Sequence, residues 1–102
     1  MQLTFSDEAN LELGKIYSYI SRDSSSIAKK FISRLTSYIY NLSLFPEMGV
    51  LMNVYNIRKL IYRNYIILYQ IDYYSDTIYI IKIFNSKQDI NIILKEIEKY
   101  ID

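Results

Sequence analysis

The sequence predicts an α+β domain in which a helix hairpin packs on one face of an antiparallel sheet. Two stretches near the start carry apolar residues at helical spacing, over 7–21 and from about 25 to 45. Three runs rich in β-branched and aromatic residues follow them, and a last helical pattern covers 90–101. Because short links join the three runs, we expect an antiparallel meander and the order β-α-α-β-β-β-α.

The first half of the chain predicts one short strand and two helices. Leu3-Thr4-Phe5 alternates as a strand, and Ser6 follows as the N-cap of the first helix. The polar turn at 22–26 leads into the second helix, which Pro46 and Gly49 bring to an end. Helices joined by so few residues must lie antiparallel.

The run from Ile57 to Ile71 predicts the centre of the sheet. It contains two apolar strands, 57–62 and 65–71, separated by Arg63-Asn64, which we interpret as the bend of a hairpin. A third strand, Thr77–Phe84, follows a polar turn. The central run holds three cations and no acid, so we expect it both to build the core and to present positive charge to a partner.

Composition limits the chemistry that the chain can perform. Its 102 residues suit a single domain, 1–102, and an apolar fraction of 51% is ample for a packed core. The chain has neither cysteine nor histidine, which excludes disulfides, makes a zinc site unexpected and removes the usual general base. We expect no metal and no cofactor. With no signal peptide or membrane span in the pattern, we expect a soluble, cytoplasmic protein.

The charge is distributed unevenly along the chain. Residues 24–70 hold six cations and one acid, a net charge of +5, whereas 1–23 and 71–102 each carry −2. A basic middle of this kind favours an anionic partner, although lysines that merely keep a helix face and a hairpin soluble give the same pattern.

A series of short motifs runs through the whole chain in a fixed order. The series comprises A-x-x-E-L at Ala9–Leu13, Tyr19-Ile20, Ala28, Phe31, Leu35, Leu42, Phe45-Pro46, Gly49, Arg58, the run N-Y-I-I-L-Y-Q-I at Asn64–Ile71, and Gln88-Asp89. In order and spacing this series resembles the RelE/ParE superfamily of toxins from type II toxin–antitoxin modules, the plasmid-stabilisation type.

This resemblance implies a bacterial toxin that arrests growth and is neutralised by a cognate antitoxin, whose C-terminal segment wraps the toxin as a strand and a helix. RelE-like members are ribosome-dependent endoribonucleases that cleave messenger RNA, and are also called mRNA interferases. ParE-like members inhibit DNA gyrase and need no nuclease site. A third alternative is a non-toxic relative that only binds its antitoxin.

Departures from the family pattern favour the ParE-like branch, and hence a non-enzymatic inhibitor. RelE-like nucleases place an arginine after the tyrosine that opens the central strand, where this chain has Ile66 after Tyr65. They place another beyond the last strand, where Lys87 is the nearest candidate and lacks the bidentate grip of arginine on phosphate. ParE-like members often carry a His and an Arg there, against Asn85 and Lys87 here. Arg58 is the family cation retained in type and place.

Five cations are the candidate residues for contact with a target or an antitoxin. They are Arg58, Lys59, Arg63, Lys82 and Lys87, and a nuclease would use Arg58, Lys82 and Lys87. We assign no firm catalytic residue.

Each candidate also has a structural interpretation. Arg58 could pair with a carboxylate such as Asp72, and Lys59 falls on the opposite side of its strand. Arg63 sits at a bend where a solvated cation is ordinary. Lys82, the sole charge in an apolar strand, is interpreted as facing an open groove.

Three tyrosines are also weighed as either core residues or residues with a chemical role. Tyr65 and Tyr69 share a strand face and are interpreted as core residues. Tyr100 is the tyrosine near the C-terminus that could mimic a RelE-type acid or base, and its helical position favours packing.

Overall fold

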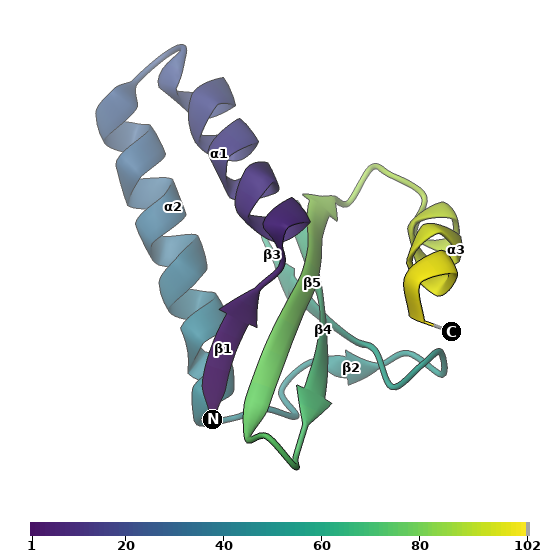
Figure 1. Ribbon diagram of the computed structural model, residues 1–102. Helices are drawn as coiled ribbons and strands as arrows, with labels where there is room; N and C mark the ends of the chain where they lie inside the picture. The colour runs from purple at the N-terminus through teal and green to yellow at the C-terminus, as the bar shows by residue number, and fades with distance from the viewer. Residues whose placement is uncertain (102) are drawn as a thin grey trace.

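The chain folds into three layers: a helix hairpin, a five-stranded sheet and a single C-terminal helix on the opposite face (Figure 1). The computed structural model describes the backbone of residues 1–101 and the side chains of residues 1–99. The elements in chain order are β1 (Gln2–Phe5), α1 (Asp7–Ser21), α2 (Ser25–Tyr40), the 3-10 helix η1 (Asn41–Ser43), β2 (Val50–Leu51), β3 (Arg58–Tyr62), β4 (Tyr65–Asp72), β5 (Thr77–Asn85) and α3 (Ile90–Ile101). The predicted class is confirmed, and the predicted helices and strands occur in the predicted order, with β2 as one further strand.

The sheet is mixed, which corrects the expectation of a wholly antiparallel one. Its strand order is β1-β5-β4-β3-β2, and β3, β4 and β5 form the predicted antiparallel meander. β1 is the edge strand beside β5 and runs parallel to it, with Leu3 opposite Ile78. The helix hairpin connects β1 at one edge of the sheet to the strands at the other edge. The alternation of apolar and polar residues indicates that a segment is a strand, but not which strand it pairs with.

Two further details differ from the sequence-based expectation. The second helix ends at Tyr40 and tightens into η1, so it is shorter than the predicted segment. The loop before the meander contains β2, two residues that pair with Arg58 and Lys59 of β3. A strand of two residues is too short for periodicity to reveal.

β4 divides the core into two parts because it is buried on both faces. Tyr65, Ile67 and Tyr69 belong to the cluster under the helix hairpin, with Leu35 and Ile39 of α2. The alternate side chains of β4 point the other way, toward α3. This second cluster contains Ile57, Ile66, Leu68, Phe84, Ile93 and Ile97.

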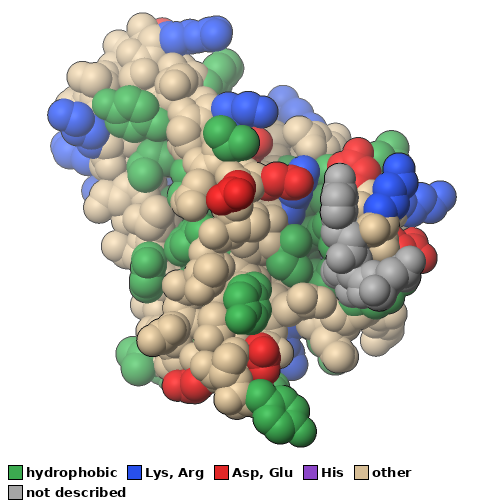
Figure 2. Space-filling view, viewed as in Figure 1, with side chains coloured by type: hydrophobic (Ala, Val, Ile, Leu, Met, Phe, Trp, Pro, Cys, Tyr) green, Lys and Arg blue, Asp and Glu red, His purple; other side chains and the backbone are tan. Residues whose placement is uncertain are grey.

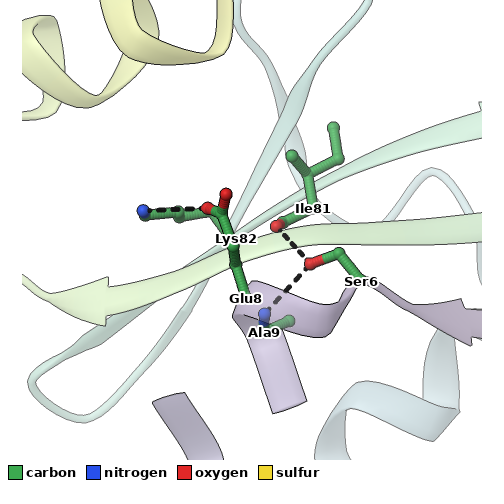
Figure 3. A network of polar contacts seen from close by, with 5 residues as sticks. All are labelled: Ser6, Glu8, Ala9, Ile81 and Lys82. Carbon is green, nitrogen blue, oxygen red and sulfur yellow. Dashed lines mark hydrogen bonds and ion pairs between the residues drawn. The ribbon is translucent and has the colours of Figure 1, made fainter. Parts of the chain in front are cut away.

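A bulge in β5 is held in place by the start of α1. Between Leu68 and Tyr69 the partner on β5 changes from Lys82 to Ile80, which leaves Ile81 as the extra residue. The Ser6 hydroxyl donates to the Ile81 carbonyl at 2.7 Å and accepts from the backbone N–H of Ala9 at 3.0 Å (Figure 3). One side chain therefore caps α1 and also provides a hydrogen-bond donor for the carbonyl of the bulged residue.

We predict that Ser6→Ala lowers the free energy of unfolding by about 1–3 kcal/mol, since a helix cap and the partly buried carbonyl of Ile81 both lose a partner. Urea unfolding followed by circular dichroism measures the change. Ser24→Ala is the matched control, because Ser24 caps α2 by accepting from the N–H of Ile27 but makes no bond to the sheet. A loss no greater in Ser6→Ala than in Ser24→Ala would contradict the double role of Ser6.

Candidate functional site

Arg58 holds a loop rather than presenting its charge freely. Its Nη1 donates to the carbonyl of Gly49 at 2.8 Å and to that of Glu47 at 3.3 Å. The alternative pairing with Asp72 is wrong, because the Asp72 carboxylate accepts instead from the backbone N–H groups of Tyr74 and Ser75. Arg58 thus fixes the segment that enters β2.

Tyr69 fixes the same loop from the core. Its hydroxyl donates to the carbonyl of Pro46 at 2.7 Å and accepts from the N–H of Gly49 at 2.9 Å. A Cβ on Gly49 would lie 2.7 Å from the Tyr69 ring and 2.9 Å from the Lys59 carbonyl, so only glycine fits. We call the segment from Pro46 to Gly49 the clamped loop.

Two tyrosines that hydrogen-bond to the clamped loop have a pKa above the ordinary value. Burial raises the pKa of the Tyr69 hydroxyl above its ordinary value, although the Gly49 N–H and the Arg58 charge act in the opposite direction. The hydrogen bond that Tyr73 donates to Glu47, 2.7 Å long, raises the pKa of that exposed tyrosine. Both hydroxyls therefore stay protonated as donors to the loop.

Lys82 lies on the other face of the sheet. It stands opposite Leu68, which in turn stands opposite Lys59, and cross-strand partners point to the same side. The Lys82 Nζ forms an ion pair with Glu8 of α1 at 3.2 Å (Figure 3). Both residues line a groove of 630 Å³ between the start of α1, β5 and α3, to which Glu96 and Lys99 also contribute.

Lys87 lines a second and larger groove, of 1240 Å³, between α1 and the ends of β4 and β5. Lys15 of α1, Arg22 just after that helix and Asn64 of the hairpin bend line it as well. The Tyr65 side chain reaches this groove from the core, and burial raises the pKa of its hydroxyl, with Glu12 adding to the effect.

Arg63 is at the tip of the β3–β4 hairpin, as the sequence predicts. It adopts a left-handed backbone with φ 52°, and its guanidinium carbon lies 5.9 Å from the centre of the Tyr62 ring. It lines neither of the two grooves.

The three candidate nuclease residues do not converge on one point. Arg58 stands opposite Tyr69 and therefore points to the helix-hairpin face, whereas Lys82 points to the α3 face. Lys87 lies at the end of β5 in a different groove from Lys82. The side chain of Tyr100 lies outside the residues described.

Sequence reasoning missed Glu8 and the clamped loop as parts of these surfaces. Glu8 reads as a helix N-terminal acid, and nothing in its spacing points to Lys82. In the sequence, Pro46 and Gly49 indicate only the end of a helix. Their hydrogen bonds with Tyr69 form only in the folded chain.

The described residues hold no group of three His, Cys, Asp or Glu side chains placed to bind a metal ion. Within the same residues, no helix has the length and the apolar character that crossing a bilayer requires.

We predict that Tyr69→Phe lowers the free energy of unfolding by about 1–3 kcal/mol at neutral pH, because a buried donor and acceptor lose their partner. The raised pKa adds a pH dependence. Above pH 10.0, the ordinary tyrosine pKa, the unfolded chain releases the Tyr69 proton before the folded chain does, so stability falls as pH rises. Tyr69→Phe therefore loses less stability above that pH than the wild type, in urea titrations at a series of pH values.

Tyr73→Phe is the matched control, since it removes an exposed hydroxyl bonded to Glu47 of the same loop. We expect it to lose less stability than Tyr69→Phe at neutral pH. Equal losses in the two variants would show that the buried hydroxyl does not hold the loop.

Comparison with known proteins finds a matching family and similar solved structures. The family model of the ParE toxin of the type II toxin–antitoxin system, parDE, matches residues 3–90. A search of the curated proteins gave no match. A solved chain of the chromosomal ParDE system from P. aeruginosa has a TM-score of 0.70 at 20% identity, covering 83% of this chain and 95% of that one.

Two E. coli structures share the same fold. A chain of the intact RelBE toxin–antitoxin complex has a TM-score of 0.62 at 16% identity, covering 85% of this chain and 98% of that one. The isolated RelE toxin has a TM-score of 0.62 at 15% identity and covers 98% of both chains. The resemblance to RelE/ParE toxins is therefore confirmed at the level of the fold. Because the family model spans most of the sequence, the chain belongs to the ParE toxin family of type II toxin–antitoxin systems.

Proposed function

We propose that this protein is a growth-arresting toxin that inhibits DNA gyrase in the cytoplasm and is neutralised by a cognate antitoxin. The observation that carries the proposal is the match of the ParE toxin model to residues 3–90. ParE-like members act on gyrase, and their action requires no nuclease site.

The placement of the cations supports inhibition over messenger-RNA cleavage. A nuclease must gather positive charge around one phosphate as charge develops in the transition state. Here Arg58 donates to two loop carbonyls, and Lys82 is paired with Glu8 on the opposite face of the sheet. Bringing the two together would require the sheet itself to rearrange.

The β2 edge of the sheet supports an antitoxin as the partner. β2 pairs with two residues of β3, and among the described residues Leu60, Ile61 and Tyr62 pair only with β4. An extended segment can add to such an edge through main-chain hydrogen bonds. Large apolar side chains are exposed beside it, namely Leu44, Phe45, Met48, Val50, Leu51 and Ile61. An amphipathic helix or strand of a partner would cover them.

The supercoiling reaction tests the proposal. We expect the purified chain to block supercoiling of relaxed plasmid by gyrase in a dose-dependent manner, and we expect the product of an adjacent antitoxin gene to restore it. Unaltered supercoiling at excess toxin would refute gyrase as the target.

A parallel primer-extension experiment on translated messenger RNA separates the alternatives. Cuts in the ribosomal A site, abolished in Lys82→Gln, would establish the RelE-like nuclease instead. Normal growth of bacteria that express the chain alone would establish a non-toxic relative.

A further inference from the structure

The outward face of α2 carries positive charge without any compensating acid. Lys29, Lys30 and Arg34 are all exposed, and the helix from Ser25 to Tyr40 contains neither Asp nor Glu. None of the three forms an ion pair within the described side chains, 1–99. Since the helix carries no carboxylate of its own and none of the three is ion-paired, this face favours anions.

The tip of the β3–β4 hairpin extends this charged face. Lys30, Arg34 and Tyr38 follow one another at intervals of four residues, so they form one row along α2. The Tyr38 ring lies 5.1 Å from the ring of Tyr62, and the guanidinium of Arg63 lies 5.9 Å from that same ring. Arg63 therefore adds a fourth cation beside the row.

The first half of α1 and the helix α3 differ from this face in their charge. The first half of α1 carries Asp7, Glu8 and Glu12, and α3 alternates Lys95 and Lys99 with Glu96 and Glu98. Figure 2 shows blue side chains along the outer side of the helix hairpin, at the upper left, while most of the red side chains in that view lie over the middle and lower parts of the molecule.

The form of the surface indicates which polyanion fits it. Single-stranded nucleic acid is held by aromatic rings on which bases stack. The rings beside Arg34 and Arg63 are not free for stacking, because Phe31, Tyr38 and Tyr62 are partly buried and pack against one another. The one exposed ring of α2, Tyr40 at its C-terminal end, lies 6.0 Å from the ring of Phe5, so the helix offers no row of rings for successive bases. What the face offers instead is exposed Lys, Arg and Ser on a rigid helix, including Ser33 and Ser37. These are the side chains that contact the phosphates of duplex DNA.

We propose that the surface formed by Lys29, Lys30, Arg34 and Arg63 binds the phosphate backbone of duplex DNA. Because the contacts are made to phosphates, binding is independent of base sequence. The biological role of this surface rests on the proposed function: an inhibitor of gyrase meets that enzyme with DNA already bound, and this face holds the DNA while other surfaces hold the protein.

Binding of the full-length chain to a short fluorescent DNA duplex, without gyrase, tests the proposal. Fluorescence anisotropy over a series of salt concentrations gives the affinity and its salt dependence. In the triple variant K29Q/K30Q/R34Q we expect the slope of log K against log salt to become shallower by about three units, about one for each phosphate contact. Affinity near 0.1 M salt should fall on the order of a hundredfold. Arg63→Gln alone should change the slope by about one unit.

The double variant K95Q/K99Q is the matched control, since it removes exposed lysines from α3 and should leave the slope unchanged. Circular dichroism confirms that each variant folds. The proposal is overturned if the wild type does not bind the duplex at low salt, or if the α2 and α3 variants lose affinity equally. It is also overturned if polyglutamate or single-stranded RNA binds more tightly than the duplex.

The supercoiling reaction keeps this proposal separate from the proposed function. A chain that binds the duplex but leaves gyrase unaffected would refute the gyrase target and leave the DNA surface standing. A K29Q/K30Q/R34Q variant that no longer binds DNA, yet inhibits gyrase as well as the wild type, would refute the role given to this surface.

Discussion

Burial of β4 on both faces is the constraint on which the rest of the structure depends. From Tyr65 to Tyr69 every side chain is buried, alternately under the helix hairpin and under α3. Fully burying a large apolar side chain contributes about 1.5–3 kcal/mol, so a strand covered on one face only would forfeit much of its stabilisation. The helix hairpin and α3 are thus the two covers that this strand requires.

The same strand positions the candidate site residues on the two faces of the sheet. At its C-terminal half, Tyr69 extends through the core to the clamped loop, and Arg58 on the neighbouring strand holds that loop from outside. On the opposite face, Leu68 separates Lys59 from Lys82. Since alternate residues of a strand face opposite sides, cations near one another in sequence end on different surfaces.

This separation places the candidate cations on distinct surfaces of the protein rather than around one point. The sheet edge at β2 and β3 exposes apolar side chains and backbone groups, which suits a polypeptide. The outer face of α2 exposes cations without acids, which suits a polyanion. The proposed binding of an antitoxin and the proposed contact with DNA each use one of these surfaces.

The sequence by itself determined the order of the elements, the helix hairpin, the three-stranded meander with its bend at Arg63-Asn64, and the core positions of Tyr65 and Tyr69, because periodicity and turn chemistry act over a few residues. It also located the basic middle of the chain. Only the tertiary structure decided that β1 lies parallel to β5, that Arg58 bonds to loop carbonyls and not to Asp72, and that Glu8 meets Lys82. These contacts join residues far apart in the chain or depend on how a loop closes, and no local pattern specifies which partner a strand edge or a charged side chain will meet.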